Sequence, residues 1–275
     1  MEYEKEQGLE QAKQLAWEIG NECLELLLEN GSEKYFKQKF PNLKLAFVKE
    51  MTAVVCIDEG CAHKDYNGKG KLTLAGAGIL FPAQSEEKRI KIVAGLFSAL
   101  GIKDVTSHEG CGAVGLAYQR DFPGSKISKE GLEAYGKDWV RKIIEARARA
   151  GHEANAEHIV AEDMERPSEF HTARVVYFDA VGGFNPNKEV DLPKGFVISK
   201  RHIPGAYPFE ELKVAVNIAF GHHAFGKLFT EKMPFVVVPL ANDEAELEAL
   251  KAEIKNKLEN NENFFKIKID GVVVN

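Results

Sequence analysis

The sequence predicts an α/β protein in which a mostly parallel central sheet is flanked by helices. Short runs of β-branched apolar residues, such as 52–57 and 174–180, are typical of strands buried on both faces. Segments whose apolar residues recur every three or four positions, such as 86–100, alternate with these runs and are typical of amphipathic helices. A strand, a helix and a strand in succession place the two strands parallel in one sheet.

The remaining elements follow from the same two patterns and from capping residues. Ser85 is expected to cap the first turn of the helix over 86–100, and Gly101 is expected to end it. Residues 151–172 are polar and weakly periodic, so we predict a helix fragment followed by a loop. The other predicted helices are 6–30, 32–40, 112–120, 129–150, 208–229 and 244–258, and the other predicted strands are 71–75, 103–107, 196–199, 234–240 and 264–274.

The chain is predicted to form a single α/β domain over its 275 residues. Residues 1–45 are expected to form a helical arm, 46–185 a zinc-binding core, and 186–275 a C-terminal extension packed on that core. No internal repeat, low-complexity segment or flexible linker divides the sequence. We therefore expect one hydrophobic core.

Charge and cysteine content exclude several kinds of partner. The net charge is −6, charges of both signs are interspersed, and no basic run is long enough to follow a phosphate backbone, so nucleic acid is not an expected partner. The first residues are acidic, and no apolar stretch approaches the roughly 20 residues that span a bilayer, so we expect a cytoplasmic protein without a membrane partner. Four cysteines in a chain of this length favour burial or metal binding over disulfides.

Three soft-metal ligands follow two of the predicted strands. Cys56 ends the run 52–57, and His108 and Cys111 follow the strand 103–107. The carboxyl ends of parallel strands meet at one edge of a sheet, where ligands bind. Three protein ligands are the number found in catalytic zinc sites, whereas structural sites have four. From spacing alone, a packed histidine beside inert thiols is an open alternative, and Cys61 is a candidate fourth ligand.

A longer pattern around these ligands is similar to that of the β-class carbonic anhydrases, which have Cys-x-Asp-Ser-Arg, an Ala-Gly-Asn loop and His-x-x-Cys-Gly in this order. The resemblance covers residues 52–114 well and 174–184 weakly. It implies that Zn²⁺ is held by Cys56, His108 and Cys111, and that the protein interconverts carbon dioxide and bicarbonate. It also implies a homodimer, with the first helix packing across subunits. The matching residues are Cys56-x-Asp58, Ala75-Gly76-Ala77-Gly78 and His108-x-x-Cys111-Gly112.

The chain departs from this pattern at Gly60, which stands where the family has the arginine that pairs with the aspartate. Either Asp58 binds the metal and closes the site, or it orients or deprotonates the metal's water while another cation replaces the arginine. Arg201, which follows the predicted strand 196–199, is our candidate for that cation and for a catalytic role with Asp58. The alternative interpretation of Arg201 is a solvated basic turn.

The missing arginine and the segment 221–226 are also similar to the limiting-CO2-inducible proteins, which share the β-like fold and are sometimes called theta-class anhydrases. His222 and His223 are candidate proton carriers or ordinary interface residues. Two further hypotheses keep the same metal. One is a non-catalytic zinc module in which Asp58 or Cys61 closes the site, and the other is a hydrolase of carbonyl sulfide or carbon disulfide.

Overall fold

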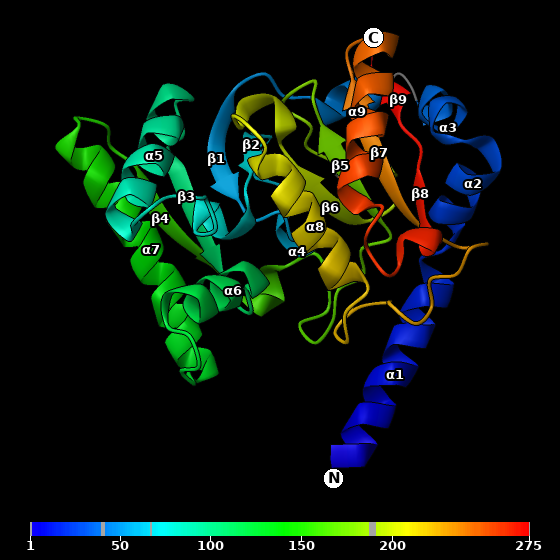
Figure 1. Cartoon of the computed structure of the whole chain (residues 1–275), viewed down its shortest axis with the longest axis horizontal. Coiled ribbons are helices and arrows are strands. Elements are labelled where there is room, and N and C mark those ends of the chain that lie inside the picture. The colour runs from blue at the N-terminus through cyan, green and yellow to red at the C-terminus, as the bar shows by residue number, and fades with distance from the viewer. Residues whose placement is uncertain (1, 40–41, 67, 187–190, 275) are drawn as a thin grey trace.

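The computed structural model of the chain describes residues 2–39, 42–66, 68–186 and 191–274. It shows an α/β protein with parallel sheets flanked by helices, which confirms the predicted class (Figure 1). Within these ranges, every pairing between named strands is parallel. Parallel pairing requires crossover connections, and helices supply most of them.

The first sheet has the strand order β2-β1-β3-β4. Helices α5 and α7 pack against each other beside this sheet, and α6 packs on α7 (Figure 1). The predicted cap at Ser85 is confirmed, because its side chain accepts a hydrogen bond from the Lys88 N–H. The elements are β1 (Met51–Val55), β2 (Gly70–Thr73), α5 (Glu86–Ala99), β3 (Asp104–His108), α6 (Gly112–Asp121), α7 (Lys129–Arg149) and β4 (Asn155–Ile159).

The second sheet has the order β6-β5-β7-β8, and β9 also pairs with β7. Helix α8 packs on β5 and β6, and α9 packs on β7. The predicted boundary between residues 185 and 186 falls between β5 and β6, which are neighbours in this sheet. The elements are β5 (Val175–Asp179), β6 (Gly195–Ile198), α8 (Tyr207–Ala219), β7 (Phe235–Ala241), α9 (Glu244–Leu258), β8 (Ile267–Ile269) and β9 (Val272–Val273).

The N-terminal arm differs from the prediction of one helix over 6–30. It contains α1 (Glu2–Ile19), α2 (Glu22–Asn30) and α3 (Ser32–Lys39). The guanidinium of Arg174 donates hydrogen bonds to the carbonyls of Ala16 and Trp17 in the last turn of α1, where the Ala16 carbonyl also accepts from the Gly20 N–H. A Cβ at Gly20 would lie 2.5 Å from Nη2 of Arg174. An arginine distant in sequence therefore ends the helix.

Three other predicted elements have different limits. Residues 151–172 contain strand β4, where we predicted a helix fragment. The prediction failed because β4 lies at a sheet edge and its exposed polar residues lack the apolar pattern of a buried strand. Helix α8 ends at Ala219 and not near Phe229. The predicted strand 264–274 is the short 3₁₀ helix η5 (Phe264–Lys266) followed by β8 and β9.

The two sheets meet beside the ends of β1 and β2. The Val197 N–H of β6 donates to the Ile57 carbonyl, with 3.2 Å between nitrogen and oxygen. Ser199, directly after β6, bonds through its hydroxyl to the backbone and side chain of Thr73. Buried apolar side chains from both sheets form one continuous core. In the described part of the chain, no helix is both long and apolar enough to cross a membrane.

Candidate metal centre

The predicted ligands Cys56, His108 and Cys111 lie together at the carboxyl ends of the neighbouring strands β1 and β3. Each offers a donor atom, and these atoms are all within 4.8 Å of one another. Cys56 follows β1 directly, His108 ends β3, and Cys111 precedes the first turn of α6. Because β1 and β3 are parallel neighbours, their ends bring the three side chains together. This group can hold a metal ion.

The geometry of the group fits a thiophilic metal such as Zn²⁺. The sulfurs of Cys56 and Cys111 are 4.0 Å apart. Two sulfurs bound at about 2.3 Å to one tetrahedral zinc would be about 3.8 Å apart. Nδ1 of His108 lies 2.9 Å from the Glu109 carbonyl, to which it can donate. That bond leaves Nε2 of His108 as the acceptor, and this buried atom has no hydrogen-bond partner among the residues described.

Backbone N–H groups surround both sulfurs. The hydrogen bond from Cys56 and the backbone N–H groups of Val114 and Ala113 lower the pKa of Cys111 against the opposing effect of burial. These two N–H groups belong to the first turn of α6, which favours a thiolate. The Gly76 N–H donates to the sulfur of Cys56 over 3.4 Å. Without a metal, the site therefore favours the anionic sulfur at Cys111, whereas the hydrogen bond with Cys111 and burial raise the pKa of Cys56.

The loop Ala75–Gly78 carries this Gly76 contact and has a left-handed backbone. Gly76 and Ala77 both have φ of +52°, which costs an alanine roughly 1 kcal/mol. Trp139 of α7 holds the loop by donating from Nε1 to the Ala77 carbonyl over 3.0 Å. Glu211 of α8 accepts from the Ala75 N–H over 2.7 Å, and burial raises the pKa of Glu211 to about 8. Two helices thus fix the loop against the sulfurs.

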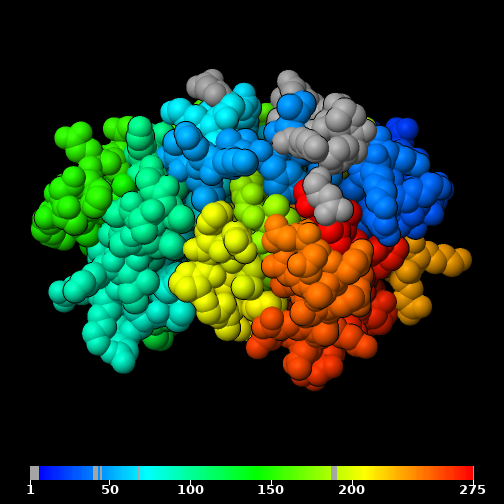
Figure 2. Space-filling view, turned by 90° about the horizontal axis from the view of Figure 1, so that it is seen from above, coloured from blue at the N-terminus to red at the C-terminus, as the bar shows by residue number. Residues whose placement is uncertain are grey.

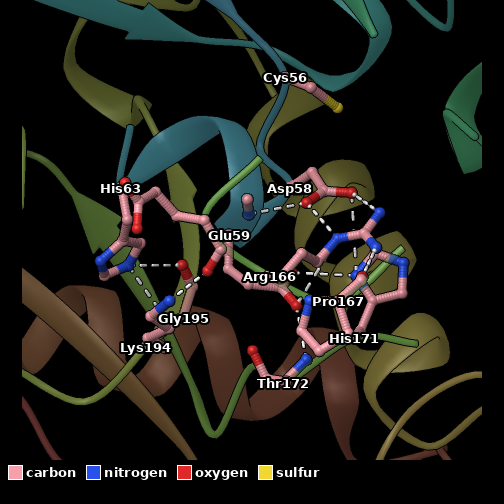
Figure 3. A network of polar contacts seen from close by, with 12 residues as sticks. Cys56, Asp58, Glu59, His63, Arg166, Pro167, His171, Thr172, Lys194 and Gly195 are labelled. Atoms are coloured by element: carbon pink, nitrogen blue, oxygen red, sulfur yellow. Dashed lines mark hydrogen bonds and ion pairs between the residues drawn. The ribbon is translucent and has the colours of Figure 1, made fainter. Parts of the chain in front are cut away.

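Asp58 forms a two-bond ion pair with Arg166 (Figure 3). Nε and Nη2 of the guanidinium each donate to one carboxylate oxygen over 2.8 Å, and both side chains are about 95% buried. Our prediction that Arg201 pairs with Asp58 is therefore wrong. Arg201 is exposed in the 3₁₀ helix η4 (Lys200–His202). A cation does replace the missing local arginine, but it comes from the segment after β4.

Gly60 makes room for this arginine. A Cβ at position 60 would lie 2.8 Å from Cγ of Arg166 and 2.8 Å from Cε of Met164. The Gly60 N–H also donates to Oδ1 of Asp58, which precedes the short helix α4 (Glu59–Ala62). Gly60, which stands where the β-class carbonic anhydrase pattern has an arginine, is thus the residue over which the side chain of Arg166 passes.

Glu59 and His171 extend the ion pair into a buried network (Figure 3). Nδ1 of His171 lies 2.9 Å from Oε2 of Glu59 and 3.8 Å from Oδ2 of Asp58. Oε1 of Glu59 accepts from the Thr172 N–H over 2.6 Å. The donor atoms of Asp58, Glu59 and His171 also lie within 4.8 Å of one another. Because the guanidinium of Arg166 already binds both oxygens of Asp58, this second group is an ion-pair network.

The network shifts the protonation of its members in opposite directions. Burial disfavours the charge of Asp58, but His171 and Arg166 outweigh it and lower the pKa of this carboxyl below its ordinary value. Burial likewise disfavours a charged His171, but Glu59 and Asp58 outweigh it and raise the pKa of the imidazole. With His171 protonated, two anions face two cations. Such balance is what buried charges require.

Two cavities touch the candidate metal centre. One has a volume of about 10 Å³ and is lined by residues that include Cys56, Asp58, His171 and Phe196. The other, of about 210 Å³, lies between α6 and α7 and touches His108 and Cys111. Only the small cavity brings a metal ligand together with the Asp58 network, so we take it as the place where chemistry can occur.

The remaining candidates from the sequence lie outside the metal group. Cys61 is buried in α4 and does not belong to it. His222 and His223 are exposed after α8, and the His223 carbonyl accepts from the His171 N–H over 2.8 Å. Sequence reasoning missed Arg166 and His171 as site residues, because they lie in a polar stretch without periodicity.

Comparison with known proteins returned no match to this chain among protein-family models, curated proteins or solved structures.

The first prediction concerns metal content. We expect one zinc ion per chain in protein purified with added zinc, and strongly reduced zinc in Cys56→Ser and His108→Ala, because each variant removes one of three ligands. Cys61→Ser should keep its zinc. Plasma mass spectrometry of the dialysed proteins measures this. Equal zinc loss in Cys61→Ser and Cys56→Ser would make Cys61 a ligand.

The second prediction concerns the buried ion pair. Arg166→Met should lower the free energy of unfolding by about 3–5 kcal/mol, because it leaves the Asp58 carboxylate buried without its counter-ion. The double variant with Asp58→Asn should recover part of this loss. Arg141→Met, on an exposed side chain of α7, should cost no more than about 1 kcal/mol. Urea unfolding measures all three, and equal losses for Arg166→Met and Arg141→Met contradict the pairing.

The third prediction concerns pH. The folded pKa of His171 lies above its unfolded value of about 6.5. Its charge therefore stabilises the fold fully below that unfolded value, and this contribution disappears as the pH rises through the folded pKa. The unfolding free energy of the native protein minus that of His171→Gln should be larger at pH 6 than at pH 9. A difference that is constant or grows with pH would refute the raised pKa.

Proposed function

We propose that this protein catalyses the zinc-dependent reversible hydration of carbon dioxide to bicarbonate. The observation that carries the proposal is the two-bond pair of Arg166 with Asp58 beside the Cys56, His108 and Cys111 group. A carboxylate engaged by a guanidinium is not free to act as a fourth ligand. Three protein ligands then leave one position for water, which is the arrangement of catalytic zinc sites.

When bound, zinc supplies a Lewis acid that makes hydroxide available from water near neutral pH. Two thiolates offset much of the charge of the metal, which increases the dependence on neighbouring groups. Here the Gly76 N–H and the first turn of α6 donate to the sulfurs and draw negative charge from them. Trp139 and Glu211 fix the loop that carries Gly76.

Asp58 is the group that orients the attacking water. Its carboxylate lines the small cavity, and Arg166 keeps it ionised, so it accepts hydrogen bonds and does not donate them. Holding the water by one hydrogen directs an oxygen lone pair toward the substrate carbon, which lowers the entropic part of the barrier.

His171 is the group that takes up the proton at a pH above its raised pKa, where its imidazole is neutral. Hydration of carbon dioxide releases one proton for each bicarbonate, and a base must carry it to solvent. His171 lines the same cavity, and Glu59 holds its ring through Nδ1. The His171 N–H donates to the carbonyl of His223, whose exposed imidazole is a second candidate base for passing the proton to solvent.

The lining of the small cavity, rather than its size, is compatible with the substrate. A volume of about 10 Å³ accepts a molecule about the size of water, and part of its lining is apolar, including Phe196 and Ile218. Carbon dioxide is small and has no net charge, so it needs no fixed counter-ion. The non-catalytic module needs Asp58 or Cys61 as a fourth ligand. Asp58 is engaged by Arg166, and Cys61 lies outside the group of Cys56, His108 and Cys111.

The fourth prediction is enzymatic. Zinc-loaded protein should accelerate carbon dioxide hydration in a stopped-flow pH-indicator assay, and chelator should abolish the effect. Asp58→Asn should lower kcat by about 10²–10⁴-fold, the range of a lost acid–base group. His171→Gln should be slow in weak buffer and rescued by imidazole, whereas Arg201→Gln should match the native rate.

Two outcomes would overturn the proposed function. One is a fully zinc-loaded protein whose rate does not exceed that of buffer alone. The other is a zinc spectroscopic analysis that shows four protein ligands at both low and high pH, because no position would then remain for water.

A further inference from the structure

A third, larger cavity lies between α5 and α7. These two helices form one end of the molecule (Figure 2). Its volume is about 860 Å³, and none of its lining residues belongs to the metal centre or the Asp58 network. Its volume lies within the range of pockets that bind small organic molecules. The residues that matter below are Ile90, Ala94, Gly95, Ser98, Ala146 and Arg147.

Arg147 brings an uncompensated charge to this cavity. The residue is 3% exposed, yet Nη1 has no hydrogen-bond partner in the described part of the chain. Its Nε donates to the Ser98 hydroxyl over 3.3 Å. Burial lowers the pKa of Arg147, and none of the carboxylates in the described ranges offsets this effect. A buried guanidinium without an anion is costly, and native proteins generally pair such groups.

Gly95 leaves open space above the same cavity. It lies in the middle of α5, where glycine costs about 0.5–1 kcal/mol relative to alanine. A Cβ at this position would meet nothing within 4 Å. Neither a tight contact nor a positive φ explains the glycine within this chain. A group bound from outside the chain, lying close to the helix backbone, would explain it.

Other lining residues define the chemistry of that group. Lys91, Arg149 and His152 are further basic residues in the lining of the cavity. Of the two acidic lining residues, Glu86 is engaged by Lys142 over 2.8 Å. The apolar part of the lining comes from Ile90, Ala94 and Ala146. The lining thus combines basic side chains and two glutamates, Glu86 and Glu87, with apolar residues.

We propose that this cavity binds a small amphipathic carboxylate. The carboxylate pairs with the guanidinium of Arg147, and the apolar chain lies along Ile90, Ala94 and the open face of Gly95. A planar guanidinium matches two carboxylate oxygens, which makes a carboxylate a suitable head group. The site is independent of the proposed hydration of carbon dioxide, so either can fail without the other.

Octanoate titrated into the native protein by isothermal calorimetry tests the proposal. We expect saturable binding at one site, at least tenfold weaker binding in Arg147→Gln, and none in Gly95→Leu, whose side chain fills the space. Arg141→Gln, on the exposed side of α7, is the matched control and should bind as the native protein does. Gly95→Leu should melt no lower than the native protein, because leucine favours a helix more than glycine does.

Stability without ligand gives a second readout that a purely structural role of Arg147 would not produce. Arg147→Gln should unfold at the same temperature as the native protein or higher, because an unpaired buried charge is removed. Octanoate should raise the melting temperature of the native protein but not of this variant. A large loss of stability in Arg147→Gln would show that the guanidinium is already satisfied within the fold, and would overturn the proposal.

Two further results would also overturn it. One is octanoate binding of equal affinity in native protein, Arg147→Gln and Gly95→Leu, which would indicate adsorption elsewhere. The other is a dimer in sedimentation experiments that Gly95→Leu converts to a monomer, because a second copy would then occupy the cavity.

Discussion

The buried pair of Asp58 and Arg166 is the interaction on which the candidate site depends. Its two hydrogen bonds join residues 108 positions apart, in a place almost without solvent. Removing either partner would leave a charge buried, so the segment after β4 must dock for the site to be stable. Gly60 is the steric condition for this docking, because any side chain there would occupy the path of Arg166.

The same pair connects the two sheets to the metal group. Asp58 follows β1 of the first sheet, whereas His171 leads into β5 of the second. Glu59 links them through its bonds to His171 and Thr172. The sulfur ligands are fixed from the opposite side by the Ala75–Gly78 loop and the first turn of α6. The metal group is therefore held by rigid elements on one side and by balanced charges on the other.

The cavity at Asp58 and the cavity at Arg147 differ in the balance of charge around them. Around Asp58, acidic and basic side chains satisfy one another, and what is left open is a space for about one water molecule. Around Arg147, the chain supplies a cation without an anion, and what is left open is a larger space. The electrostatic state of each cavity, more than its size, indicates the class of molecule that it suits.

The sequence was enough to predict the local features: the class of fold, the principal strands and helices, and the three candidate metal ligands. The strands and helices follow from short periodic patterns. The grouping of Cys56, His108 and Cys111 follows from the rule that parallel strands end at one edge, together with the resemblance to the β-class carbonic anhydrase pattern. Only the tertiary structure decided which arginine pairs with Asp58, where α1 ends, and that residues 155–159 form an edge strand. Arg166 and Arg174 act on partners more than 100 residues away, and such contacts leave no periodic signature in the sequence.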